Sequence, residues 1–446
     1  MIDKRESFIP YRRTDLINLC LEDGKLQGEN IKIFKEFCEI LSAFFHFQFH
    51  ETLESIKDNY VVFNPNTDIQ PLNSPSLRDH EAMKSQVIDG FNYMLERANY
   101  QQLPNDIIQK SLDKKSLINL KTEVDFNDFE QFLCYYCGDI DETIIVKKFG
   151  FFEREKIVDI LERVVLLIHF KGEGYFQAKA KKNKQQKELN FIPGKMYLYF
   201  YKNIPKLDIE LLFPNIKTSM TLKDRLLFGV PAIGAAVPLL LKAFPNILII
   251  IVAISILINA PSIVEFIKVE KEKVHDIMPI LVATLSLTIT LGGFAFRQYN
   301  QYKSKQIKFQ KEVSDTLFFK NLANNASVFQ ALADIAEEEE CKEIILVYYH
   351  LLTSKEKLNP EQLDQKIEQW MTEKLGIDIN FDIHGPLNNL QNIHGKILTE
   401  ESNENEQKDV PILSYDEKGN ILILPLKQAR MVIDYVWDNA FQYNGC

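Results

Sequence analysis

The sequence predicts an α+β protein, mainly helical, in which a membrane helical hairpin is flanked by two soluble regions. Two long uncharged runs predict the hairpin. Short β-branched and aromatic runs from Thr143 onward predict an antiparallel sheet, and apolar residues at helical spacing predict helices. The expected division is an N-terminal soluble domain at 1–225, a membrane region at 226–297 and a C-terminal soluble helical domain at 298–446.

Composition limits the classes of function. The net charge of −10 argues against a nucleic-acid partner, because a phosphate backbone is bound by clustered Lys and Arg. Six cysteines in 446 residues do not make the disulfide framework of a small secreted protein, so we expect the soluble parts to face a reducing compartment. The opening residues resemble neither a secretory signal nor a transit peptide.

The N-terminal region is expected to begin with helices and to end in a sheet. Residues 31–60 and 76–100 have the helical spacing. Four short runs then predict antiparallel strands: "TIIVKKFGFF" from Thr143, "RVVLLIHFKG" from Arg163, "GYFQAKAKK" from Gly174 and "GKMYLYFYKN" from Gly194. The basic run at 179–187 is interpreted as a solvated hairpin tip rather than a phosphate or lipid site.

The membrane region carries the predicted spans at 243–264 and 277–296, each long enough at 1.5 Å per residue for a hydrocarbon core about 30 Å thick. The run before them, 226–241, is shorter and is cut by Pro231 and Pro238. A re-entrant or interfacial lead-in is favoured there, and a third span stays open as the alternative.

Charges around the spans predict their orientation. Nine Lys and Arg residues flank the hairpin and three lie in its loop, so both termini are expected in the cytoplasm. The spans contain no ionisable residue, which argues against a proton path. A pore made by oligomerisation stays possible, because Gly292 and Gly293 would allow close helix contact.

The C-terminal region is expected to continue as helices, one at 326–352 and one that starts at Asn359 with Pro360 in its first turn. Short strands and a closing helix then suggest a winged-helix-like end at 359–446. Its expected second helix offers His384 and His394 but no Lys or Arg, so a partner-binding or structural role is favoured over DNA binding.

Candidate chemistry is sparse. His46 and His50 lie one helical turn apart, a spacing that can hold a metal, but ordinary structural histidines are favoured. The CxxC at 134–137 is interpreted as buried thiols, and the "EEEE" run at 337–340 as a solvated helix face. No phosphate-binding loop or nucleophile motif is present in the sequence. No cofactor is expected, and the chain is predicted not to be an enzyme.

Three stretches carry a family resemblance: "ESFIPYRRTDLINLCL", "FYKNIPKLDIELLFPNIKTSMTLKDRL" and "LFFKNLANNASVFQALADIAEEEECKEIILVYYHLL". Through them the chain resembles the transmembrane protein 143 family, a domain of unknown function shared by bacterial, plastid and mitochondrial membrane proteins. The resemblance implies two central membrane helices with soluble parts on either side, and no established activity. The family-like positions are Asn203, Pro205, Asp208, Glu210, Pro214, Asp224, Arg225, Lys320, Asn321, Asn324 and Asn325.

The expected function is that of a non-enzymatic, membrane-anchored cytoplasmic scaffold or adaptor whose two soluble flanks pack together. Two alternatives stay open for the acidic element at 208–210: either Asp208 or Glu210 docks on the Lys320 segment, or each element is a local turn within its own domain. The alternatives are a subunit of an oligomeric membrane channel or transporter, and a metal-dependent hydrolase that uses His46 and His50. The expected partners are a lipid bilayer and either another protein or a second copy of the chain, and the expected location is a bacterial inner membrane.

Overall fold

The computed structural model describes residues 5, 7–73, 75–104, 107–108, 121–148, 152–183, 189–219, 317–397 and 408–441, with scattered residues between 286 and 314. The chain divides into two compact units. The first comprises Met1–Ile108, Phe126–Ile209 and Lys320–Cys446, and the second comprises Gln109–Asp125 and Glu210–Phe319. The predicted division at 1–225, 226–297 and 298–446 stays a prediction.

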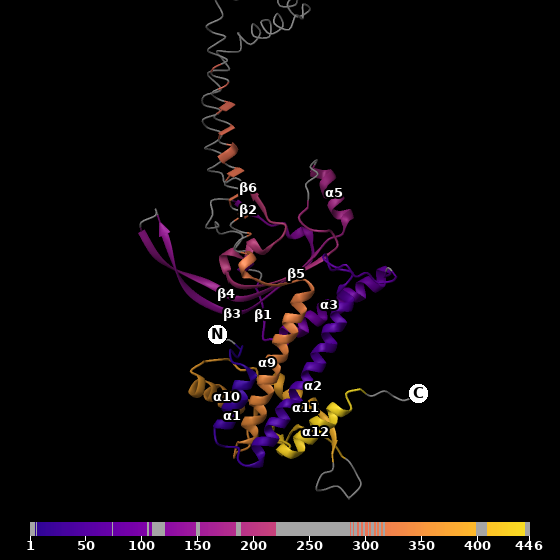
Figure 1. The fold of residues 1–446 in the computed structure, drawn as a ribbon, viewed down its shortest axis with the longest axis vertical. Helices are drawn as coiled ribbons and strands as arrows, with labels where there is room; N and C mark the ends of the chain where they lie inside the picture. The colour runs from indigo at the N-terminus through magenta and orange to yellow at the C-terminus, as the bar shows by residue number, and fades with distance from the viewer. Residues whose placement is uncertain are drawn as a thin grey trace, which may run out of the picture. The chain divides into compact units, whose positions relative to one another are not determined.

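The first unit holds the long helices (Figure 1). They are α1 (Arg13–Glu22), α2 (Glu29–Tyr60), α3 (Leu77–Arg97), α5 (Glu173–Asn183), α9 (Ala326–Leu352), α10 (Pro360–Leu375), α11 (His384–Asn392) and α12 (Leu426–Asp438). Helix α10 starts where the sequence predicts, since Asn359 caps the backbone of Gln362 and Pro360 occupies the first turn. It ends at Gly376, whose φ of 69° suits a residue without a side chain.

An antiparallel sheet lies against these helices in the order β1-β3-β4-β5-β7. Its strands are β1 (Gln101–Gln102), β3 (Phe129–Lys148), β4 (Phe152–Phe170), β5 (Met196–Pro205) and β7 (Asn321–Asn324), and the short helix η1 (Phe126–Asp128) leads into β3. The register pairs Phe129 with Phe170 and Tyr199 with Asn324. Strands from before and after the second unit's main segment therefore share one sheet.

One predicted strand is wrong. The run from Gly174 forms most of helix α5, and its basic residues up to Asn183 are helical instead of forming a hairpin tip. Alanines and lysines in this run favour helix over strand, whereas the aromatic run in β5 does pair as predicted.

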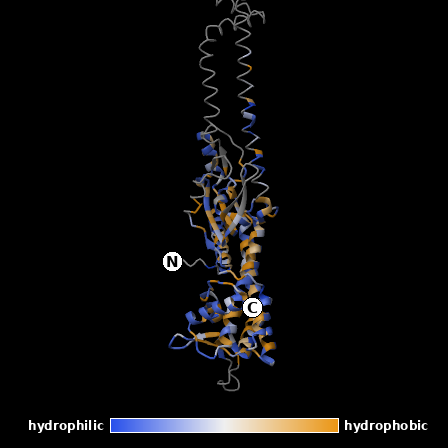
Figure 2. Cartoon of the chain, turned by 90° about the vertical axis from the view of Figure 1, so that its left-hand side faces the viewer, coloured by the Kyte–Doolittle hydropathy of each residue, from blue (hydrophilic) through white to orange (hydrophobic). Residues whose placement is uncertain are grey.

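Helix α9 lies in the middle of the first unit and packs against α1, α2, α3, α10 and α11 (Figure 1). Every residue from Glu339 to His350 is buried. The centroid of the Phe37 ring on α2 lies 4.5 Å from that of the Tyr348 ring. Hydrophobic and hydrophilic residues are mixed over the lower part of the chain in Figure 2. This central position gives α9 neighbours on all sides, which matters for the charges that it carries.

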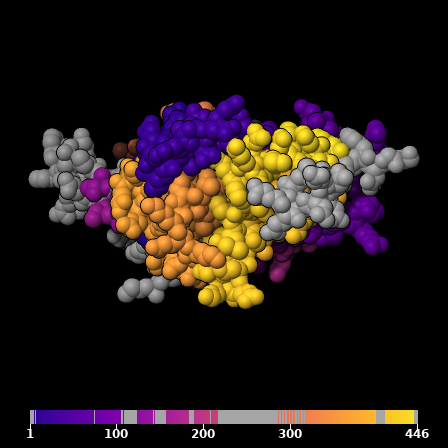
Figure 3. Space-filling model, turned by 90° about the horizontal axis from the view of Figure 1, so that it is seen from below, coloured from indigo at the N-terminus to yellow at the C-terminus, as the bar shows by residue number. Residues whose placement is uncertain are grey.

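The C-terminal strands form two separate ladders among the described residues: β8 (His394–Ile397) pairs with β9 (Lys408–Pro411), and β10 (Leu413–Tyr415) pairs with β11 (Ile421–Ile423). Helix α12 packs on α2, so N-terminal and C-terminal residues lie side by side on one surface (Figure 3). Helix α11 buries Leu387 and Leu390. A winged-helix-like end is therefore not supported: among the described residues the strands form two separate two-stranded ladders, and the supported class for this end is α+β with antiparallel strands.

The described part of the second unit is small. Strands β2 (Lys121–Glu123) and β6 (Lys217–Ser219) pair antiparallel, and the Asn215 side-chain amide donates to the carbonyl of Asp125 at 2.9 Å. The unit boundary falls inside the short helix η2 (Lys206–Leu212).

The membrane hairpin must be corrected. The predicted span at 243–264 lies outside the described residues, and of 277–296 only isolated residues are described. Among the residues that the structure describes, no helix combines the length and the apolar character needed to cross a bilayer. The long helices α2 and α9 fail because charges interrupt both. The supported fold class is α+β with antiparallel sheets, and a multi-pass protein of the bacterial inner membrane is not supported.

Candidate functional site

The most unusual chemistry of the described residues is a row of charges on the buried helix α9. The charged row consists of Glu337, Glu338, Glu339, Glu340, Lys342 and Glu343. Glu339 and Glu340 are 1% and 2% exposed, and Lys342 and Glu343 are each 3% exposed. The interpretation of this run as a solvated helix face is wrong. Buried charges are costly unless they are paired and hydrogen-bonded, so the partners of this row define the site.

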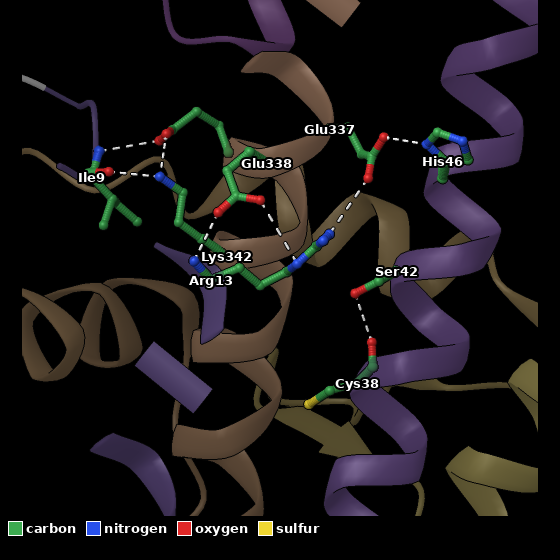
Figure 4. A network of polar contacts seen from close by, with 9 residues as sticks. Ile9, Arg13, Cys38, Ser42, His46, Glu337, Glu338 and Lys342 are labelled. Carbon is green, nitrogen blue, oxygen red and sulfur yellow. Dashed lines mark hydrogen bonds and ion pairs between the residues drawn. The ribbon is translucent and has the colours of Figure 1, made fainter. Parts of the chain in front are cut away.

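Glu339 and Lys342 both hold the backbone of Ile9, and Figure 4 shows Lys342 beside Ile9. The Ile9 amide donates to Glu339 Oε2 at 3.1 Å, and Lys342 Nζ donates to the Ile9 carbonyl at 2.6 Å. The two side chains also form an ion pair with each other. Burial raises the pKa of Glu339, and the charge of Lys342 opposes that rise. One buried ion pair therefore satisfies both backbone groups of a single residue in an extended segment.

The segment held in this way is the N-terminal strap, defined as residues 7–12, which precedes α1. The side chain of Ile9 is fully buried. The Phe8 ring has a cation on each of two neighbouring elements, with Arg163 Cζ 4.8 Å and Lys342 Nζ 5.1 Å from its centroid. Such cation–π contacts favour an aromatic residue at this position of the strap.

Three further contacts fix the strap and its ends. Asn99 Nδ2 donates to the carbonyl of Ser7 at 3.3 Å, and Glu338 Oε1 accepts from the amide of Arg13 at 2.7 Å. At the other end, Arg5 Nη1 donates to Glu368 Oε2 at 2.8 Å. Two elements far apart in sequence, α9 and the turn after α3, thus supply side chains that hydrogen-bond to the backbone of the strap.

The remaining buried acids tie the row to its neighbours. Glu340 accepts from Arg97 Nη1 at 3.0 Å and from the side-chain amide of Asn389. Glu343 accepts from Asn99 Nδ2 at 2.6 Å, and its burial together with the charge of Glu340 raises its pKa well above the usual range. Asn99 therefore connects Glu343 to the strap, in a backbone conformation with φ of 59° that asparagine tolerates.

The charged row ends at Glu337, which contacts the exposed His46, one of the two predicted metal candidates. Glu337 Oε2 lies 2.7 Å from His46 Nδ1, and Glu337 Oε1 lies 3.5 Å from Arg13 (Figure 4). The rings of His46 and His50 stack at 6.4 Å. Within the described ranges, no group of three or more His, Cys, Asp or Glu residues is arranged to hold a metal ion. The described residues therefore give no support to a metal-dependent hydrolase that uses these histidines.

The CxxC thiols are buried, as predicted, on strand β3. Cys134 and Cys137 are 2% and 5% exposed, and burial raises the pKa of Cys134 to about 12. A thiol with so high a pKa is a poor nucleophile at neutral pH.

Several family-like positions lie where β5 meets β7. Lys320 Nζ donates to the carbonyl of Asn203 at 2.6 Å, and Asn321 Nδ2 donates to Asn324 Oδ1 at 2.7 Å. Asn325, at φ of 50°, accepts from the amide of Leu198 at 3.3 Å. The predicted contact of Asp208 or Glu210 with the Lys320 segment stays a prediction, while the backbone ladder between β5 and β7 joins the two segments directly.

The other family-like positions are more scattered. Pro205 ends β5, Asp208 is half-buried in η2, and Glu210 is 1% exposed. Pro214 is half-buried. The remaining two family-like positions, Asp224 and Arg225, lie outside the described residues. None of these positions belongs to the charged row.

A comparison with known families finds a match over part of the chain. Residues 161–327 match a protein of unknown function (DUF3754). The match covers less than half of the chain and ends before the charged row. It replaces the resemblance to the transmembrane protein 143 family, which is not supported. No solved structure matches this chain.

These findings also correct the expected function. The scaffold anchored in a membrane and the channel or transporter subunit both depend on the membrane hairpin, which the described residues do not support. The matched family supplies no activity. Function therefore has to be argued from the charged row.

One feature of the sequence could have indicated that these charges are buried, namely the apolar run that follows them. Glu339 and Lys342 are three residues apart, and the apolar run that follows them from Ile344 to Tyr349 covers all faces of the helix. A helix that is apolar on all sides is buried. The charges that immediately precede such a run would then be expected to have buried partners.

Proposed function

We propose that the first unit is a receptor for an extended peptide segment, and that its binding site is occupied in this chain by the N-terminal strap. The strap site is defined as Asn99, Arg163, Glu339, Lys342 and Glu368. The observation that carries the proposal is the clamp on Ile9, in which two buried charged side chains hold the backbone amide and carbonyl of one residue.

The clamp recognises main chain, which is how receptors bind extended peptides of varied sequence. Backbone contacts give affinity, and pockets for alternate side chains give specificity. Here the contacts to Ser7, Ile9 and Arg13 all involve backbone atoms, while Ile9 fills a pocket. The strap is thus bound as a peptide ligand would be bound.

Stability alone gives a weak reason for this arrangement. A buried ion pair is often no more stabilising than apolar residues of similar volume, because desolvation offsets the attraction. Glu339 and Lys342 instead fix the register of the segment, because only one residue can present its amide and carbonyl to both groups at once. Register selection is useful to a binding site.

Charge also favours a peptide ligand of one kind. Arg5 and Arg13 flank the strap, and the surrounding elements present Glu337, Glu338 and Glu368 to them. Complementary charges speed encounter and suppress wrong partners. A segment with basic residues at its two ends matches this site.

Binding of a labelled peptide tests the proposal. In the full chain, Ile9→Asp places a carboxylate in the apolar pocket and weakens the strap, and a fluorescent peptide of residues 5–13 is then titrated by anisotropy. We expect saturable binding to the Ile9→Asp chain and weaker binding to the unmodified chain, whose own strap competes.

Two further variants identify the site. Adding Lys342→Met to the Ile9→Asp chain should abolish binding, because the ligand carbonyl loses its donor. Adding Lys355→Met should leave binding unchanged, since that lysine is exposed just beyond α9. A folded Ile9→Asp chain, with a cooperative thermal transition, that fails to bind the peptide would refute the proposed function.

A further inference from the structure

The side chains around the strap specify more than a main-chain clamp. Resting on the proposed function, we propose that the partner protein contributes an extended segment with an arginine, two residues of free choice, an aromatic residue and a branched aliphatic residue in that order. This chain shows the pattern at Arg5, just before the strap, and at Phe8 and Ile9 within it. Each of the three positions meets a different chemical environment.

The first position meets acceptors arranged for a guanidinium. Arg5 Nη1 lies 2.8 Å from Glu368 Oε2, 3.0 Å from the carbonyl of Ile379 and 3.4 Å from Asp378 Oδ1. The Arg5 side chain is only 32% exposed, so these contacts are partly shielded from water. All three contacts are made by one nitrogen, so they do not use the fork of the guanidinium. A guanidinium is more weakly hydrated than an ammonium group, so its partial burial costs less and arginine is preferred over lysine here.

The aromatic position meets two cations. Arg163 and Lys342 both lie within about 6 Å of the Phe8 ring centroid, the range in which a ring face attracts a cation. An aliphatic side chain of similar size would fill the space without that attraction. Lys342 Nζ also donates to the Ile9 carbonyl, so the same ammonium group contacts the aromatic ring and fixes the register of the segment.

The aliphatic position meets a closed pocket. Ile9 is 0% exposed, and its backbone is clamped on both sides. A charged or amide side chain at this point would be buried without a partner. Position 7 is left open in the pattern, because the described contact to Ser7 is made to its backbone carbonyl. Position 6 is left open because it lies outside the described residues.

A set of peptides tests the pattern on the full-length Ile9→Asp chain. The parent peptide of residues 5–13 is compared with versions that carry Arg5→Gln, Arg5→Lys, Phe8→Leu or Ile9→Asp. We expect Arg5→Gln to weaken binding about 10-fold or more, Phe8→Leu to weaken it about 3- to 30-fold, and Ile9→Asp to abolish it. Arg5→Lys should fall between the parent and Arg5→Gln.

A double-mutant cycle assigns the arginine contact. In a receptor that also carries Asp378→Asn and Glu368→Gln, the effect of Arg5→Gln in the peptide should shrink to less than about 3-fold. A matched control, Glu361→Gln at the exposed start of α10, should leave the full effect of Arg5→Gln. If the effect persists in the double receptor variant, the arginine is not read at this point.

The outcomes separate the pattern from the proposed function. If all peptides bind as tightly as the parent, the sequence pattern is refuted while main-chain recognition stands. If the parent itself fails to bind a folded chain, the proposed function is refuted first. Should Ile9→Asp prevent folding, Ile9→Ala weakens the strap less severely and the same comparison is made with that chain. A dimer detected by light scattering on the unmodified chain would identify a second copy as the occupant and overturn the assignment to a partner protein.

Discussion

Replacing Lys342 with methionine removes one half of the clamp while keeping the length of the side chain. Glu339, 1% exposed, then loses the cation that opposes its desolvation, and the Ile9 carbonyl loses a donor at 2.6 Å. Breaking a buried pair by removing one partner typically costs about 3–5 kcal/mol. We expect Lys342→Met to lower the free energy of unfolding by that amount at pH 7.5.

The double variant Lys342→Met with Glu339→Gln separates two contributions to the loss of stability, the lost contacts and the buried charge of Glu339 that is left without a partner. Glutamine is neutral and can still accept the Ile9 amide, so most of the loss should be recovered and the double variant should lie about 1–2 kcal/mol below the unmodified chain. The stranded charge also predicts a pH effect. Because burial raises the pKa of Glu339, its cost is full at high pH and declines as pH falls toward 4.5, so the single variant should recover stability in acid.

Urea unfolding followed by tryptophan fluorescence measures these values. The chain has two tryptophans, and Trp370 on α10 is 6% exposed, so it reports the loss of packing around α9. Lys355→Met serves as the control and should change stability by less than about 0.5 kcal/mol. A single variant that loses less than about 1 kcal/mol, or a double variant that loses as much as the two singles together, would refute the clamp as described.

Three other predictions follow from the same core. Burial, with Lys25 and Lys366 nearby, lowers the pKa of His350 to about 3, so its neutral form contributes stability above pH 6.5 that is lost as pH falls. Between pH 7.5 and 5.5 the free energy of unfolding of the unmodified chain should fall by about 1.4 kcal/mol more than that of His350→Phe, as measured by urea unfolding. Equal pH slopes for the two chains would contradict this. Glu343→Gln should change stability at pH 7.5 by less than about 1 kcal/mol, because the amide keeps the Asn99 contact. Glu343→Leu removes the acceptor at 2.6 Å and leaves Asn99 with the 3.3 Å contact to Ser7, so it should cost about 1–3 kcal/mol in the same assay. Hydrogen exchange at the Ile9 amide should become faster when the peptide of residues 5–13 is added in excess, since the peptide displaces the strap; an unchanged rate, equal to that of the α9 amides, would mean that the strap opens only with global unfolding.

Local sequence rules predicted the elements whose stabilising contacts are local. Helix α9 spans 326–352 as predicted, and α10 begins at Pro360 because the cap and the proline act within one turn. Strand β5 follows its aromatic run. The sheet as a whole was less predictable, because β7 joins β5 across more than a hundred residues and no local pattern specifies that partner.

The charged row could not be interpreted correctly from its own residues. Four consecutive glutamates occupy all faces of a helix, which is typical of a solvated surface. Their burial depends on the strap, on Arg97 and on Asn389, which lie far away in sequence. The membrane hairpin was predicted from uncharged length alone, and that criterion finds no such helix among the described residues.

The strap and a ligand from another protein would compete for the same contacts, and this competition sets what a binding assay can detect. A ligand that needs the open site has its apparent affinity reduced by the fraction of chains in which the strap is released. If release costs about 3 kcal/mol, the unmodified chain binds about 150-fold more weakly than a chain without a competing strap. Ile9→Asp removes the competition and leaves Glu339 and Lys342 in place, so it should raise the apparent affinity without changing the clamp. Equal affinity of both chains for the peptide would mean that the peptide binds elsewhere on the protein.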